Sequence, residues 1–387
     1  MRKPMKLFLL IVVIVLLSSC VKTMHPVEPL AIQDTELPEN HTQESAPLIL
    51  GGKHYVGRVG DVVVIDAIGT QDWIEESRKC FLEDAASLLY VSFDIDPLDP
   101  NKMNTLENIE LLTNVKRLRI YGENLDSVDL TPLSALSSLE FLFIKGDICR
   151  PPDLTSLEKL TEIVIRGSFL ESFEGLGAPN VREMTIEMET FDSMAPLSNL
   201  TELEFIDIGA PRSNLVTIGN IRNVPKLKSL FLGTGGIIDL TGIEQITGLV
   251  DLRLNYFSTL INTQGISGLH NLEILVMYGI EDENPSIEYL RGLPNLQDVC
   301  IESIPSIWSY KIKEPYQILD ISPLGESPKL ENIDLRGFII KNVSALNHLE
   351  NLRYNAIILH ESRLLDETEA QRATKWLIFN VSILRDG

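Results

Sequence analysis

The sequence lacks the short motifs that mark common catalytic sites. It contains no phosphate-binding glycine loop, no His-Glu-x-x-His pair, no Cys-x-x-Cys pair and no nucleophile elbow. The chain's 6 histidines are scattered, and His270 and His348 fall at equivalent places just before a repeated strand pattern. We therefore expect neither an enzyme nor a resident cofactor or metal.

Aromatic residues are scarce, at 6% of the chain, whereas hydrophobic residues of all kinds make up 44%. Leucine and isoleucine must therefore supply the core. Basic residues are also few, with 33 Lys and Arg against 55 Asp and Glu and a formal net charge of -22. Such an excess of acid argues against binding nucleic acid or anionic lipid through a broad field. It fits a solvated surface or a basic partner.

Long apolar runs are missing too. The run Leu7 to Leu17 follows Arg2, Lys3 and Lys6, and it falls short of the roughly 20 residues that span a membrane. Its length and charged start are typical of a secretory signal. One interpretation is an ordinary signal peptide that happens to be followed by a cysteine, Cys20.

The next residues, Leu17-Ser18-Ser19-Cys20, resemble the lipobox of bacterial lipoproteins. The resemblance implies cleavage before Cys20 and acyl chains (palmitate among them) on that residue, and several chains together give a stable membrane anchor. Val21, in place of Asp, resembles the pattern that permits transfer to the outer membrane. We therefore expect an exported, membrane-anchored lipoprotein at the outer membrane or cell surface.

Three cysteines remain beyond Cys20, namely Cys80, Cys149 and Cys300. An odd number cannot pair completely within the chain. Cys149 and Cys300 are separated by several copies of the repeat described next, which is too far for a disulfide. We interpret all three as buried or semi-buried free thiols, in preference to redox-active ones.

The chain does contain a recurring pattern, of which Leu249-Val-Asp-Leu252-Arg-Leu254 is a clear copy. Two apolar residues at spacing 2 form the inner edge of a short strand, and a third, three residues earlier, buries the preceding turn. One such strand has nothing to pack against, but stacked copies do. Copies begin at Leu88, Val115, Leu139, Leu160, Val181, Leu200, Leu227, Leu249, Leu272, Leu296, Leu330 and Leu349.

A period in the low twenties with L-x-x-L-x-L is typical of leucine-rich repeats. Turns such as Asp129-Leu-Thr-Pro132-Leu133 and Asp320-Ile-Ser-Pro323-Leu324 resemble the internalin and SDS22-like class. The resemblance implies a leucine-rich repeat horseshoe, an α/β-type solenoid with a parallel concave sheet of about 11 to 12 strands. Its convex side would be short or irregular.

The turn after each strand departs from that class, which places an Asn there. Gly recurs instead, at Gly122, Gly146, Gly167, Gly279 and Gly337. Because Gly adopts positive φ at little cost, we expect Gly rather than an Asn ladder to make this turn.

The expected organisation has five parts. A signal peptide covers 1-19, the lipidated Cys and a flexible Pro-rich tether 20-50, and an N-terminal cap 51-87 with a strand at Val62 to Ile65 and a helix at Gln71 to Asp84. The repeats cover 88-354. A C-terminal cap covers 355-387, with a helix at Asp366 to Lys375 before Trp376-Leu-Ile-Phe379. Caps are expected because the ends of a solenoid expose its core.

Function would then depend on the concave face, which displays the residues flanking and between each inward pair. Twelve strands about 4.8 Å apart span roughly 50 Å, enough for a folded partner. Exposed aromatic and branched residues mark recognition surfaces, and an acidic middle favours a cationic region of the partner. The candidate binding residues are Tyr121, Phe141, Phe143, Glu183, Glu204, Phe231, Tyr256, Ile274, Val276 and Tyr278.

Two other segments have residues that suggest a binding role. Asp94, Asp96, Asp99 and Asn101 do not complete a calcium-binding EF-hand, because Leu98 and Thr105 replace ligands. The long repeat after Leu296 contains Trp308, Tyr310 and Tyr316, and insertions of this kind either join a binding surface or are tolerated surface loops.

The leading hypothesis is a lipid-anchored extracytoplasmic protein that binds a protein or peptide through its concave face without catalysis. Glycan-bearing partners fit the same hypothesis. The alternative is a structural or scaffolding envelope lipoprotein, and an enzyme is the least favoured class.

Overall fold

The computed structural model describes the repeats and short pieces of both flanks, all within one compact unit spanning Gln43–Gly387. The described residues are 49–50, 53–54, 62–65, 90–98, 104–122, 124–191, 197, 200–255, 259–280, 285–303, 317–352, 357–360, 363–364 and 377–378. Several predicted features lie outside them, namely the signal peptide, Cys20, the tether up to residue 48, both expected cap helices, Cys80, Tyr256 and the insertion aromatics.

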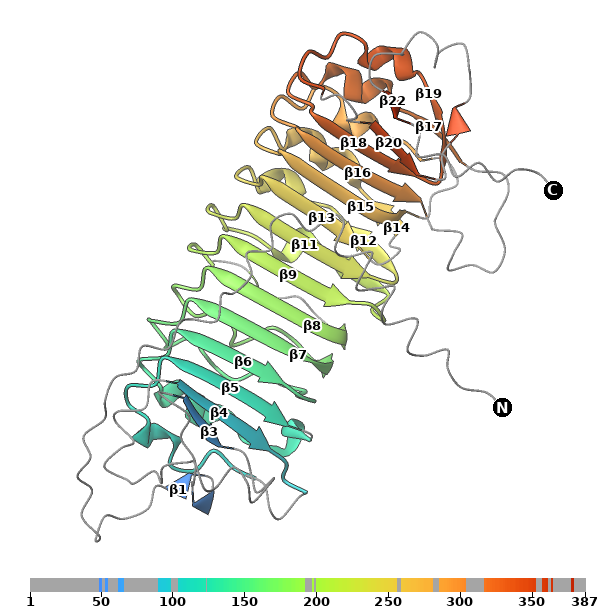
Figure 1. The fold of residues 1–387 in the computed structure, drawn as a ribbon. Coiled ribbons are helices and arrows are strands. Elements are labelled where there is room, and N and C mark those ends of the chain that lie inside the picture. Colours follow the sequence, from blue (N-terminus) through green and yellow to red (C-terminus); the bar gives the residue numbers. More distant parts are fainter. Residues whose placement is uncertain are drawn as a thin grey trace, which may run out of the picture. The chain divides into compact units, whose positions relative to one another are not determined.

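A parallel sheet of 14 strands runs through this unit, and each strand pairs with the next repeat along the chain (Figure 1). Its strands are β3 (Val62–Ile65), β4 (Tyr90–Ile95), β5 (Arg117–Gly122), β6 (Phe141–Lys145), β7 (Glu162–Leu170), β8 (Glu183–Phe191), β9 (Phe205–Ala210), β11 (Ser229–Thr234), β13 (Asp251–Asn255), β15 (Ile274–Ile280), β16 (Asp298–Ser303), β18 (Asn332–Arg336), β20 (Ile357–His360) and β22 (Leu377–Ile378). We call it the main sheet.

Two parallel sheets of 3 strands each lie on the return path of the chain. One contains β10 (Leu215–Thr217), β12 (Ile237–Asp239) and β14 (Thr259–Ile261), and the other β17 (Gln317–Asp320), β19 (Phe338–Lys341) and β21 (Arg363–Leu364). A short antiparallel pair, β1 (Ile49–Leu50) and β2 (Lys53–His54), precedes the main sheet. The repeat pattern did not predict the two small sheets.

Every described helix is a short 3-10 helix on the side opposite the main strands. They are η2 (Ile109–Leu111), η3 (Leu125–Ser127), η4 (Thr131–Ala135), η5 (Ile218–Asn220), η6 (Ile243–Gln245), η7 (Thr263–Gly268), η8 (Glu288–Leu290), η9 (Ser322–Glu326) and η10 (Val343–Leu346). Pro132 and Pro323 are the second residues of η4 and η9, within the first turn, where a missing N–H is tolerated. The short Pro-Leu-marked turns are therefore confirmed.

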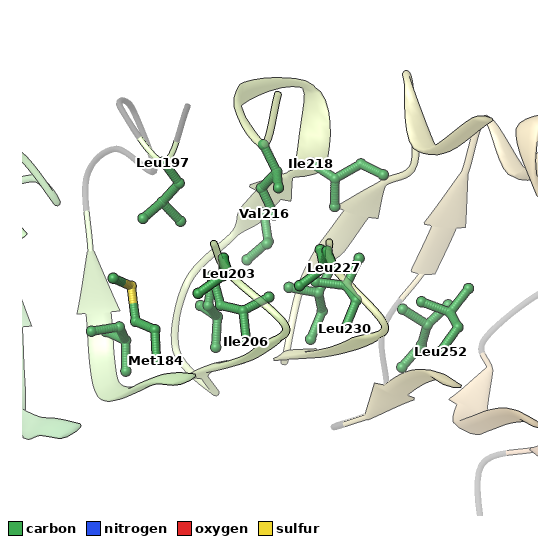
Figure 2. Packing of buried hydrophobic residues seen from close by; sticks show 14 of the residues in the cluster. Met184, Leu197, Leu203, Ile206, Val216, Ile218, Leu227, Leu230 and Leu252 are labelled. Carbon is green, nitrogen blue, oxygen red and sulfur yellow. The ribbon is translucent and has the colours of Figure 1, made fainter. Parts of the chain in front are cut away.

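The core is one continuous column of aliphatic side chains. Leu118, Leu142, Ile163, Leu230, Leu252 and Leu275 all belong to a single buried cluster with 0% exposure. Figure 2 shows Leu230 and Leu252, from neighbouring strands, and Val216 and Ile218, from the return path, among the side chains of this core. The stacked-repeat prediction is confirmed, because each apolar pair is covered by the pairs of its neighbours.

One repeat begins later than predicted. Leu230 pairs with Ile206 in the main sheet, so Leu203, rather than Leu200, is the equivalent of Leu227. Leu200 and Leu203 are both buried. Because Leu200, Leu203 and Ile206 are spaced by three residues, the repeat pattern could begin at either leucine. The last predicted copy, which begins at Leu349, is also placed too early. It predicts Leu352 as the first inward residue, but β20 begins five positions later, at Ile357, which pairs with Ile333.

The glycines after the main strands are required for a different reason than predicted. A Cβ on Gly122 would lie 2.2 Å from the Ile95 carbonyl oxygen, and one on Gly146 would lie 2.1 Å from the Gly122 carbonyl oxygen. Gly167 stands against Gly146 in the same way, at 2.1 Å. Of Gly122, Gly146, Gly167 and Gly337, only Gly337 has a positive φ, of 79°. Close backbone stacking between repeats, rather than left-handed geometry, excludes a side chain at the first three positions.

Asparagine does form a ladder, but before the strands rather than after them. The side-chain amides of Asn180, Asn271, Asn295 and Asn351 each donate to a backbone carbonyl of the preceding repeat, at 2.7 to 2.8 Å. These bonds satisfy carbonyls that the turn leaves without a backbone partner.

Aspartates in the Asp-x-Thr/Ser turns stabilise the return path by accepting hydrogen bonds. Thr131 and Ser322 donate their backbone N–H to Asp129 and Asp320, and Asn342 adds its side-chain amide to Asp320 at 2.9 Å. Partial burial opposes the charge on Asp320, but these hydrogen bonds outweigh it and hold the pKa of Asp320 at about 2. The turn motif is therefore a capping device repeated along the solenoid.

The glycine ladder gives a direct test of the stacking. Replacing Gly146 by Ala should destabilise the protein by about 2 kcal/mol or more, because the new Cβ would meet a backbone carbonyl that cannot swing away. Urea unfolding followed by circular dichroism measures this. Gly177→Ala is the control, since its Cβ would meet only Leu200 Cδ2 at 3.5 Å. Equal stability of the two variants would contradict the close stacking.

Candidate functional site

The residues that point away from the core of the main sheet form three rows, and we call this surface the outer face. Register fixes the rows, because each strand pairs residue by residue with the next. The central row contains Ser92, Arg119, Phe143, Val164, Thr185, Asp207, Phe231, Arg253, Val276, Cys300 and Asp334. This is the surface that the sequence predicted as the concave face.

A group of cations and aromatic rings covers the outer face of β5 to β7. It consists of Arg117, Arg119, Tyr121, Phe141, Phe143, Lys145 and Arg166. We call it the basic–aromatic cluster. Strand pairing brings its members together. Between β5 and β6, Arg117 pairs with Phe141, Arg119 with Phe143, and Tyr121 with Lys145. Between β6 and β7, Lys145 pairs with Arg166.

Aromatic contacts order this cluster. The rings of Tyr121 and Phe143 lie 5.2 Å apart at 44°, and the Arg117 guanidinium lies over the Phe141 ring, 4.0 Å from its centroid. Both arrangements are attractive beyond simple burial. Tyr121 keeps 37% exposure, whereas Phe141 keeps only 5%. Phe141 therefore supports Arg117 and is not itself a contact surface, contrary to the expectation that it is exposed.

Carboxylates occupy the same face on the next strands. Glu162, Glu183, Glu187 and Asp207 come from β7, β8 and β9, and we call them the acidic cluster. Glu187 joins the two groups through an ion pair with Arg166, Nε to Oε2 at 2.8 Å. Partial burial, reinforced by Glu183, raises the pKa of Glu162 although Arg117 opposes the shift. Burial also raises the pKa of Asp207 to about 6, with Glu187 reinforcing it and Arg166 and Arg253 opposing it.

Two rings follow the acidic cluster. Phe205 and Phe231 meet edge to face with centroids 5.1 Å apart, and the Arg253 guanidinium lies 4.6 Å from the Phe231 centroid. Arg253 is also paired with Asp251 on its own strand at 2.9 Å. Phe231 is thus part of an ordered, half-buried group on the outer face, and its role in binding stays a prediction.

Sequence reasoning missed Phe205 and Asp207 because it placed this repeat three residues early. In the corrected register both point outward, whereas the predicted Glu204 precedes β9. The Glu204 carboxylate lies 3.5 Å from Lys228 Nζ at the strand-entry edge. The signal that would have found them was available, since starting the copy at Leu203 equalises the neighbouring repeat lengths.

The last predicted group is more covered than expected. Ile274 and Tyr278 are partly buried, and Val276 is only 8% exposed between its paired neighbours Arg253 and Cys300. Val276 is therefore not available as a contact residue. Glu183, in contrast, is exposed on β8 as predicted.

Other site chemistry is limited in the described part of the chain. No group of three or more His, Cys, Asp or Glu is placed there to hold a metal ion. Cys149 and Cys300 form no disulfide, as expected from their separation. Cys300 is buried, whereas Cys149 is exposed, contrary to the expectation of burial. Within the same residues, no helix combines the length and apolarity needed to cross a bilayer.

The raised pKa of Asp207 makes its charge a cost to folding at neutral pH. Stability from this group is fully present below the ordinary pKa of 3.8 and is lost as pH rises through about 6. Asp207→Asn should therefore be more stable than the parent by roughly 1 to 3 kcal/mol above pH 7.

Urea unfolding at a series of pH values measures this difference, which should shrink toward pH 4. Glu183→Gln is the matched control, because this carboxylate on the neighbouring strand is exposed. A stability difference for Asp207→Asn that does not vary between pH 4 and pH 8 would contradict the assignment.

Comparison with known proteins identifies the fold. No protein-family model matches the chain, and no curated protein matches it in sequence. Among solved structures, an internalin from Listeria monocytogenes is similar, with a TM-score of 0.51 and 18% identity over 79% of this chain and 90% of that one. A leucine-rich repeat protein from Leptospira interrogans matches with a TM-score of 0.33 and 16% identity, over 78% of this chain and 97% of that one. The chain therefore has the fold of a leucine-rich repeat solenoid.

Proposed function

We propose that this protein is a non-enzymatic, lipid-anchored binding protein that engages a protein or peptide partner through its outer face. The observation that carries the proposal is the Tyr121–Phe143 pair, which leaves aromatic surface available between exposed cations. Large amphipathic rings in such settings supply most of the energy of protein recognition. The repeat scaffold supports the same view, because solenoids present extended binding surfaces.

The anchoring part of the proposal depends on Cys20 and its lipobox-like neighbours. Acyl chains there would tether the repeats to a bacterial membrane, at the outer membrane or cell surface, with the intervening Pro-rich segment as a spacer. The partner would then be a macromolecule met outside the cytoplasm.

Lipid attachment has a specific test. Cells that express the full chain and are grown with labelled palmitate should incorporate label into the protein, and Cys20→Ser should abolish the label and release the protein from the membrane fraction. Cys149→Ser is the control, because it removes an exposed thiol elsewhere. Retention of the label in Cys20→Ser would contradict the anchor.

The binding face is tested with two matched variants of the full-length chain. Phe143→Glu should reduce recovery of a cross-linked partner from the native cell envelope at least tenfold, since it places a charge in the aromatic contact. Ile261→Glu should leave recovery unchanged, because Ile261 has 38% exposure but lies on the small β10–β12–β14 sheet. Equal recovery with both variants would move the site away from the outer face.

A further inference from the structure

Positive and negative charges are segregated along the outer face. The rows of β5 to β7 display four cations, Arg117, Arg119, Lys145 and Arg166, and the single carboxylate Glu162. The rows of β8 and β9 display Glu183, Glu187 and Asp207 and no cation. In a chain with a net charge of -22, a local excess of positive charge is an exception that calls for a physical reason.

Two of these cations are exposed and unneutralised. Among the described residues, neither Arg119 nor Lys145 has a carboxylate within ion-pair distance, and both side chains are exposed. The arginines farther along the face differ, because Arg253 is paired with Asp251 and Arg336 with Asp334. The cluster on β5 to β7 therefore offers charge for a partner, whereas the later arginines are used internally.

The aromatic rings hold this charge in position. The Arg117 guanidinium lies over the Phe141 ring, 4.0 Å from the ring centroid, and such a cation–π contact restrains the guanidinium while its N–H groups stay able to bind a carboxylate. Tyr121 and Phe143 add apolar surface beside Lys145 and Arg119. A ligand with both carboxylates and apolar side chains would satisfy both parts of the cluster.

The dimensions restrict the ligand further. Three strands about 4.8 Å apart give a cluster roughly 10 Å wide, comparable with the Debye length at physiological salt. Glu183 and Glu187 of the acidic cluster lie on the adjacent strand β8. A long, uniformly charged polyanion such as a nucleic acid or sulfated glycan would extend over those carboxylates and be repelled, whereas a short acidic stretch of polypeptide would not.

We propose that the basic–aromatic cluster receives a short acidic segment of the partner protein, flanked by apolar residues. This assignment rests on the proposed function. It also predicts the orientation of the partner on the outer face. Its acidic segment lies over β5 to β7, and any basic residues beside that segment lie over Glu183, Glu187 and Asp207. Electrostatic matching of this kind sets orientation and association rate more than total affinity.

The test is a selection of random 12-residue peptides displayed on phage against the full-length chain in detergent. The peptides retained by the parent are passed over Arg119→Glu/Lys145→Glu, and those no longer bound are sequenced. The control is Lys159→Glu/Lys329→Glu, which makes the same change in net charge at two exposed positions just before Leu160 and Leu330. A synthetic copy of the most frequent peptide is then measured by fluorescence anisotropy, with dextran sulfate as a competing polyanion.

Peptides lost on Arg119→Glu/Lys145→Glu should be enriched in Asp and Glu with neighbouring aromatic or aliphatic residues. The synthetic peptide should bind that variant at least tenfold more weakly than it binds the parent and the control. Selected peptides without acidic enrichment, or equal binding by all three proteins, would overturn the inference. Displacement by dextran sulfate at lower concentration than by the peptide itself would also overturn it, in favour of a general polyanion site.

The selection separates this inference from the proposed function. Neutral peptides that bind the parent and are lost on Phe143→Glu would leave the outer face as the binding surface and remove only the acidic specificity. Peptides that bind Phe143→Glu and Arg119→Glu/Lys145→Glu as tightly as they bind the parent would contradict both.

Discussion

The structure depends on the parallel hydrogen-bonding register of the main sheet. Because Leu118, Leu142 and Ile163 are paired across consecutive strands, each inward aliphatic residue stacks on its equivalent in the next repeat. The column they form is buried completely. No repeat could bury its apolar edge alone, so the register and the core are one constraint. The stacked Gly122, Gly146 and Gly167 keep that register close at the strand exits.

The same register determines what the outer face displays. Alternation along a strand sends every second side chain away from the core, and pairing then groups those side chains by repeat. Cations and rings from β5 to β7 become neighbours although they are distant in sequence, and carboxylates from β8 and β9 border them. An outer face with segregated positive and negative charge thus follows from the order of the repeats.

Much of this was predictable from the sequence. The spacing of Leu249, Leu252 and Leu254 defines the strand, its inward pair and the solenoid, because one-sided burial specifies register strongly. The outward position of Tyr121 and Phe143 followed from the same alternation. Pro132 and Pro323 marked the short return turns, where the ring fits a 3-10 start.

Other features could not be predicted from the sequence, because they depend on contacts between repeats. Leu200 and Leu203 are both buried, so spacing alone did not reveal that Phe205 and Asp207 point outward and Glu204 does not. The burial of Phe141 depends on Arg117 stacking across strands, and that of Val276 on its paired neighbours. Steric exclusion at Gly146 involves a carbonyl of another repeat. Each of these is an inter-repeat contact, which a pattern within one repeat does not encode.

Hydrogen–deuterium exchange of Leu252→Ala tests the shared core most directly. Each repeat of a solenoid contacts only its neighbours, so the cavity should accelerate amide exchange in β13 and in its partners β11 and β15. The effect should fade toward β5 on one side and β18 on the other. Faster exchange confined to β13, with β11 and β15 unchanged, would contradict a continuous aliphatic core.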